Sequence, residues 1–90
     1  MQDYTEDSVV ISPDSTYRGL DEIRAFFTAF VEGLPEGFRD AFKVKRIEVT
    51  GDLAYTLWEA KPWVSLGTDT FVVRDGKIAV QTFATYTASE

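Results

Sequence analysis

An amphipathic helix between Leu20 and Leu34 is the feature that most constrains the fold of this chain. Its apolar residues recur mostly at steps of three and four, which places them on one face of an α-helix: Leu20, Ile23, Phe26, Phe27, Phe30, Val31 and Leu34. Asp21 and Glu22 lie in the first turn, where carboxylates favour the positive end of the helix dipole. Gly33 and Pro35 mark the end of the helix. One apolar helix face needs a partner layer, which the rest of the chain must supply.

The rest of the chain favours β-strands. Six segments are expected to be strands: residues 8–12, 16–18, 42–50, 53–63, 68–73 and 78–87. Asp75-Gly76, between two apolar segments, is a strong β-hairpin signal. The apolar alternation changes parity between Val44 and Ile47, which predicts a β-bulge near Lys45-Arg46. Residues 36–40 are expected to form a loop.

This order of elements predicts an α+β fold in a single domain, residues 1–90. Two short strands and the helix precede a four-stranded antiparallel meander. A curved antiparallel sheet of about six strands should therefore wrap around one main helix, like a cone. The concave face that the helix leaves open is expected to be a pocket.

Composition excludes several classes of function. The net charge of −6 and the absence of a basic stripe argue against nucleic acid or an anionic membrane as a partner. With no Cys and no His, disulfides, thiolate nucleophiles, the usual catalytic triads and most transition-metal sites are excluded, so we expect neither a metal nor a cofactor. No apolar run approaches the roughly 20 residues that span a bilayer, so the protein is expected to be cytoplasmic.

Several motifs resemble the SnoaL-like branch of the nuclear transport factor 2-like (ketosteroid isomerase-like) superfamily. They are Tyr4-Thr5-Glu6-Asp7-Ser8-Val9-Val10, Tyr17-Arg18-Gly19, Gly67-Thr68-Asp69-Thr70-Phe71 and Gln81-Thr82-Phe83. The resemblance covers nearly the whole chain and implies a cystatin-like roll that binds a small, largely apolar molecule. Activity is not implied, because the superfamily includes isomerases, cyclases, dehydratases and non-catalytic domains.

Two departures from the family pattern bear on function. Relatives usually begin with a long helix across the mouth of the cone, and in steroid isomerases this helix supplies a tyrosine of the oxyanion hole; this sequence begins at Met1-Gln2-Asp3. The isomerase general base directly precedes a proline, where Ser12 stands here. Steroid isomerisation by the known mechanism is therefore not expected, and the sheet surface under that helix needs another cover.

Asp69 and Glu59 are the candidate catalytic residues. By resemblance, Asp69 matches the protonated aspartic acid that donates a hydrogen bond to the oxyanion in steroid isomerases, and an apolar site could raise its pKa. The alternative for Asp69 is a strand-end carboxylate bonded to neighbouring threonines or backbone. The resemblance places Glu59 in the pocket too, where two carboxylates would suit acid–base catalysis. The alternative for Glu59 is a solvated side chain, or one paired with Lys61.

The expected ligand-binding residues combine aromatic and polar side chains: Ser12, Tyr55, Phe71, Gln81 and Phe83. Strand alternation places Tyr55 on the same face as Glu59, while Phe71 and Phe83 fit a core equally well. Tyr4 could cap the mouth of the pocket or pack on the surface. Trp58 and Trp63 are expected on the convex face or its rim, where large aromatics favour an interface and hence a homodimer.

Two functions therefore remain open from the sequence. One is acid–base catalysis of the lyase, isomerase or cyclase type on a small apolar molecule. The other is a non-catalytic ligand carrier, or a dimerisation or interaction domain, of the same fold.

Overall fold

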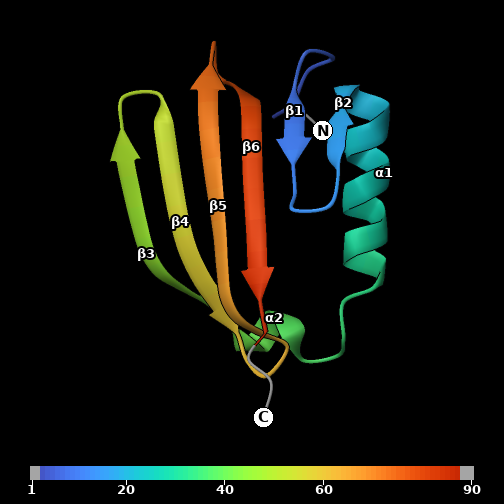
Figure 1. Cartoon of the computed structure of the whole chain (residues 1–90), viewed down its shortest axis with the longest axis vertical. Helices are drawn as coiled ribbons and strands as arrows, with labels where there is room; N and C mark the ends of the chain where they lie inside the picture. The colour runs from blue at the N-terminus through green and yellow to red at the C-terminus, as the bar shows by residue number, and fades with distance from the viewer. Residues whose placement is uncertain (1–2, 88–90) are drawn as a thin grey trace.

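The computed structural model describes residues 3–87, which form one six-stranded sheet with two helices (Figure 1). The elements are β1 (Val9–Ile11), β2 (Thr16–Arg18), α1 (Gly19–Glu32), α2 (Phe38–Ala41), β3 (Phe42–Thr50), β4 (Leu53–Ala60), β5 (Val64–Arg74) and β6 (Lys77–Tyr86). The strand order is β2-β1-β6-β5-β4-β3. The predicted α+β class, the curved sheet and the single main helix are confirmed.

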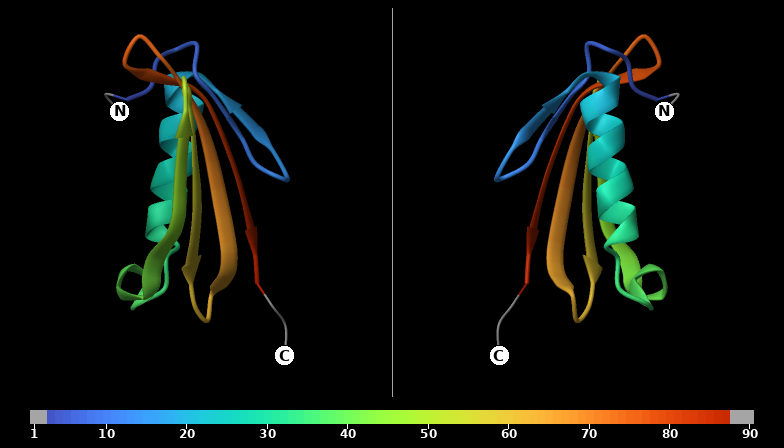
Figure 2. Two further views of the ribbon diagram at one scale, coloured as in Figure 1. Left: turned by 90° about the vertical axis from the view of Figure 1, so that its left-hand side faces the viewer. Right: turned by 90° about the vertical axis from the view of Figure 1, so that its right-hand side faces the viewer.

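Helix α1 follows the predicted apolar stripe and ends two residues earlier than expected. At its start, the Glu22 carboxylate accepts the backbone N–H of Arg18 at 2.8 Å, which satisfies a donor that lacks a helical partner. At its end, the Gly33 N–H donates to the carbonyls of Ala29 and Phe30. Ile23 is fully buried, and α1 packs on β1 and β2, along one side of the sheet (Figure 2).

The sheet is an antiparallel meander from β3 to β6, extended by β1, which pairs parallel to β6. The bulge predicted near Lys45-Arg46 is present, as a register shift between Val44 and Arg46. The β5–β6 hairpin turns at Asp75 and Gly76, with φ angles of 53° and 76°, the pair of positive values that a type I′ turn requires.

One segment expected to be a loop contains the short helix α2, whose Phe38 is buried against Trp58 and Ala60. Trp63 packs on the same cluster, with its ring 6.1 Å from that of Phe38. The expected position of Trp58 on the convex face or its rim is wrong, because its ring faces the concave side. The Trp58 ring packs there against Phe38, with 6.3 Å between the ring centroids.

Within the described residues, none of the helices is long and apolar enough to cross a membrane.

Candidate functional site

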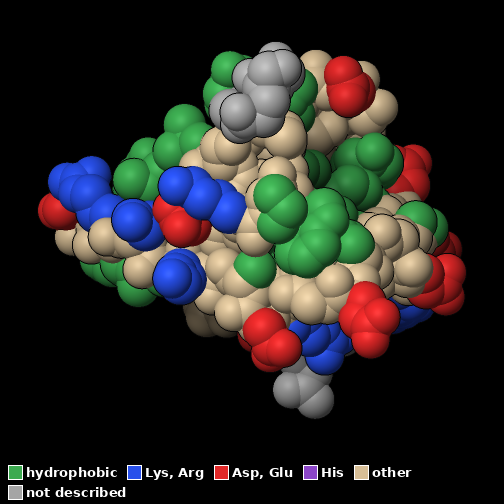
Figure 3. Space-filling model, turned by 90° about the horizontal axis from the view of Figure 1, so that it is seen from below, with side chains coloured by type: hydrophobic (Ala, Val, Ile, Leu, Met, Phe, Trp, Pro, Cys, Tyr) green, Lys and Arg blue, Asp and Glu red, His purple; other side chains and the backbone are tan. Residues whose placement is uncertain are grey.

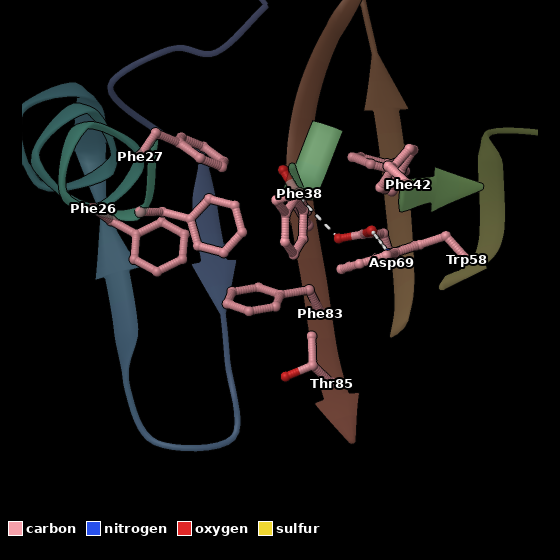
Figure 4. A pocket seen from close by; sticks show the side chains of 11 residues that line it. Phe26, Phe27, Phe38, Phe42, Trp58, Asp69, Phe83 and Thr85 are labelled. Carbon is pink, nitrogen blue, oxygen red and sulfur yellow. Dashed lines mark hydrogen bonds between the residues drawn. The ribbon is translucent and has the colours of Figure 1, made fainter. Parts of the chain in front are cut away.

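A cavity of about 230 Å³ lies between α1 and the concave face of the sheet (Figure 4). Its wall is predominantly aromatic, with a few polar side chains from β5 and β6. The lining residues are Phe26, Phe27, Phe30, Phe38, Phe42, Trp58, Asp69, Phe71, Gln81, Phe83 and Thr85. Phe26 and Phe27 reach it from α1 and Phe83 faces them from β6; the Phe26 and Phe83 rings lie 5.3 Å apart.

Gly67 positions the indole ring of Trp58. These two residues are direct partners across β4 and β5. A Cβ atom on Gly67 would lie 2.3 Å from Cε2 of Trp58, so the ring can lie over this position only because glycine has no side chain. Asp69 follows two residues later, on the same face of the strand. The indole Nε1 of Trp58 donates a hydrogen bond of 2.8 Å to Oδ2 of Asp69.

A chain of hydrogen bonds continues from Asp69 to the N-terminal segment. Nε2 of Gln81 donates to Oδ1 of Asp69 at 3.4 Å, and the Tyr4 hydroxyl donates to Oε1 of Gln81. The Tyr4 ring packs 5.7 Å from that of Phe27. Burial, with smaller contributions from the charges of Asp3 and Asp69, raises the pKa of Tyr4 to about 12. Because the Tyr4 hydroxyl donates to Oε1 of Gln81, the Nε2 side of the amide is the side that faces Asp69.

Two opposing effects act on the Asp69 carboxyl group. Burial raises the pKa of Asp69 above its ordinary value of 3.8 and is the larger effect. Hydrogen bonds from Trp58, Gln81 and Thr56 lower it, because they stabilise the ionised form. The described residues that line the pocket include no lysine or arginine. Asp69 is thus a carboxyl group in an aromatic cavity, held by neutral donors.

Comparison with known proteins decides the family. The sequence model of the SnoaL-like domain matches residues 1–81. The chain belongs to the SnoaL-like domain family. Among curated proteins, none matches the sequence.

Solved structures share the fold of this SnoaL-like domain at low sequence identity. A protein from Kribbella flavida has a TM-score of 0.76 and 19% identity over 94% of this chain and 69% of its own. A candidate isomerase of the SnoaL-like family from Agrobacterium tumefaciens has a TM-score of 0.71 and 18% identity, with coverages of 94% and 75%. A candidate polyketide cyclase from Sinorhizobium meliloti has a TM-score of 0.71 and 19% identity, with coverages of 91% and 75%. At these identities the similarity establishes the fold alone.

Four residues expected from the sequence line the pocket of the SnoaL-like domain: Asp69, Phe71, Gln81 and Phe83. Register explains why they meet, since Asp69 is paired with Phe83 and Phe71 with Gln81 across β5 and β6. Residues paired directly across two strands present their side chains on the same face. Their roles in binding or catalysis remain predictions.

Glu59 and Tyr55 do not lie in the pocket, so their expected placement is wrong. Because Trp58 faces the cavity, strand alternation turns both neighbouring positions to the outer face of the sheet. The Glu59 carboxylate pairs there with Lys45 at 3.6 Å and Lys61 at 4.0 Å. Basic side chains gather on the β3 side of the molecule (Figure 3). Tyr55 lies beneath the guanidinium of Arg46, 5.9 Å from the ring centroid.

Ser12 also lies away from the described pocket lining. Its hydroxyl donates to the carbonyl of Ser15 and accepts the backbone N–H of Ser15, at 3.0 and 3.1 Å. This is the local turn chemistry of a serine that follows a strand. Ser12 is therefore not among the residues that line the described pocket, and its hydroxyl is used in the β1–β2 turn. Its expected contact with a ligand stays a prediction.

The sequence interpretation placed Trp58 on the convex face or its rim and Tyr4 either at the mouth of the pocket or on the surface. It did not foresee their hydrogen bonds in the polar wall, which consists of Trp58, Asp69, Gln81 and the adjoining Tyr4. A signal for Trp58 lay in Gly67, two residues before Asp69. Strand β5 begins at Val64 instead of the expected residue 68, so Gly67 lies inside the strand, and a glycine inside a strand often marks the close approach of another group. No sequence signal indicated the hydrogen bond between Tyr4 and Gln81, because it joins residues 77 positions apart in the chain. Within residues 3–87, no group of three acidic side chains is arranged to hold a metal ion.

Proposed function

We propose that this SnoaL-like domain binds a small, largely apolar molecule in the aromatic pocket and exchanges a proton with it through Asp69. One observation carries the proposal: of the described residues that line the cavity, Asp69 alone is titratable, and its neighbours are mainly aromatic. Pockets for small molecules typically combine apolar walls with a few polar groups that fix orientation. A reaction of the lyase, isomerase or cyclase type needs such a group to move a proton.

The chemistry of Asp69 supports the role of a general base. A carboxylate with a raised pKa accepts a proton more readily than an ordinary aspartate. In the proposed step, an oxygen of Asp69 takes the proton from a carbon next to a carbonyl group, and the C–H electron pair moves into the enolate. The resulting carboxylic acid returns a proton to carbon. The structural similarity to a candidate isomerase and a candidate polyketide cyclase agrees with this class of reaction.

A non-catalytic carrier domain is the second candidate. It is favoured by the position of Glu59, which leaves the pocket with one carboxyl group instead of the two that acid–base catalysis often uses.

The test uses 2-tetralone, a flat apolar ketone with exchangeable protons next to its carbonyl group. We expect it to shift the indole N–H signal of Trp58 and to exchange these protons for deuterium faster than in buffer. Asp69→Asn should still bind but lose the added exchange rate by at least about 100-fold, while Asp75→Asn, in the exposed β5–β6 turn, should retain it. Binding without faster exchange would favour the carrier function. No effect on the Trp58 signal would contradict both.

A further inference from the structure

Two neutral donors at the polar end of the pocket are already engaged within the protein. Trp58 and Tyr4 each carry one polar hydrogen on the side chain, and both are engaged, on Asp69 and Gln81 respectively. Gln81 directs one N–H toward Asp69. A neutral acceptor on a ligand can still reach the second N–H of Gln81 or the Thr85 hydroxyl, so the donors alone do not decide the charge of the ligand.

The Asp69 carboxylate, in contrast, offers an acceptor. An ionised carboxylate has about four lone-pair positions, and Trp58 and Gln81 donate to two of them. Both oxygens accept hydrogen bonds from neutral groups, a pattern that suits the ionised form. Since no lysine or arginine is among the described lining residues, the remaining positions lack a countercharge from the pocket wall.

The aromatic wall complements a cation as well. The faces of phenylalanine and tryptophan rings carry a negative quadrupole potential that attracts ammonium groups, and clusters of such rings bind alkylated ammonium ions. Eight of the eleven lining residues are aromatic. An anion would meet this potential and the Asp69 charge together, and the net charge of −6 adds a long-range preference of the same sign.

We infer that the ligand of this pocket is an organic cation: a flat apolar body carrying an ammonium nitrogen that lies against the Asp69 carboxylate and the surrounding rings. The inference rests on the binding part of the proposed function and specifies the class of molecule. It does not rest on proton abstraction by Asp69, because an ammonium group paired with the carboxylate lowers its basicity. Binding requires no covalent step.

Three test ligands with the same ring system separate the effects of charge: 2-naphthylmethylammonium, 2-naphthylmethanol and 2-naphthoate. Their dissociation constants can be measured from the indole N–H signal of Trp58, with that of Trp63, which is outside the pocket lining, as an internal reference. We expect the ammonium ion to bind at least about tenfold more tightly than the alcohol. The carboxylate should bind most weakly.

Two variants of equal charge provide the control. Asp69→Asn should reduce the affinity for the ammonium ion to that for the alcohol, whereas Asp75→Asn removes a distant carboxylate and should preserve the preference. An alcohol that binds the wild type as tightly as the ammonium ion would overturn the inference and leave the proposed binding function intact. Failure of all three ligands to shift the Trp58 signal would contradict the binding function itself. If Asp69→Asn does not fold, the relative affinities of the wild type for the ammonium ion and the alcohol still test the inference.

Discussion

Gly67 is the residue on which the geometry of the polar wall depends most directly. A Cβ atom there would come within 2.3 Å of the Trp58 ring, so Gly67→Ala must push the indole away from Asp69. We expect a loss of about 1–3 kcal/mol in the free energy of unfolding, as is typical of overpacking, measured by urea denaturation. The indole N–H signal of Trp58 should also move, because its hydrogen bond to Asp69 is broken.

Gly33→Ala is the matched control for Gly67→Ala. Gly33 ends α1 at a φ of −89°, and a Cβ atom there would meet the nearest carbonyl at 3.4 Å. This substitution should leave the Trp58 signal in place. If Gly67→Ala behaved like Gly33→Ala in both measurements, the role of Gly67 in seating the indole would be refuted.

Asp69 also determines a pH dependence. Because burial raises its pKa above 3.8, the native state holds the proton more tightly than the unfolded chain does. The stabilising contribution of this proton is complete below the pKa that Asp69 has in the unfolded chain. It is lost as pH rises through the pKa that Asp69 has in the native state. Relative to Asp69→Asn, the wild type should therefore lose stability across this interval in urea denaturation. The opposite slope would mean that the hydrogen bonds from Trp58, Gln81 and Thr56 outweigh burial.

At the scale of elements, local signals were sufficient for most of the fold. The apolar stripe of α1, the Asp75-Gly76 turn and the parity change before Ile47 each specify a backbone conformation through neighbouring residues, and the structure contains all three features. Helix α2 was missed because its four residues are too few to show a period. Its position depends on the burial of Phe38 against Trp58, a tertiary contact.

The orientation of β4 shows why the site was harder to predict than the fold. Alternation correctly divided Tyr55 and Glu59 from Trp58, but it cannot say which set faces the concave side. The decision depends on the opposite strand, where Gly67 makes room for an indole ring. Ser12 lies outside the pocket lining for a different reason. Its hydroxyl forms local hydrogen bonds with Ser15, which the resemblance to a family does not take into account.

At the scale of the whole molecule, apolar side chains remain uncovered on both sides of the sheet. α1 lies along one side only (Figure 2), and beyond it Val44, Ile47 and Val49 of β3 are 49%, 63% and 65% exposed on the pocket side. On the outer face, Leu53, Leu66 and Tyr86 are 40%, 46% and 61% exposed. Apolar exposure of this kind is typical of surfaces that bind a partner.

The homodimer expected from the sequence is a prediction at this scale, through the outer face of the sheet. Leu57 lies on that face, paired with Arg46 and Thr68. We expect the wild type to sediment as a dimer at micromolar concentration, because two such faces could bury their apolar side chains against each other. Leu57→Glu should sediment as a monomer, since the interface would then bury an unpaired carboxylate on each subunit.

Ile47→Glu is the control that shows which face of the sheet forms the dimer interface. Ile47 is paired with Thr56 and lies on the pocket side, near the same edge as Leu57, so this variant introduces the same charge while leaving the outer face unchanged. It should remain a dimer. A monomeric wild type would exclude the homodimer. Dissociation by Ile47→Glu, with Leu57→Glu still dimeric, would place the interface on the pocket side, where the second subunit would cover the open edge of the cavity.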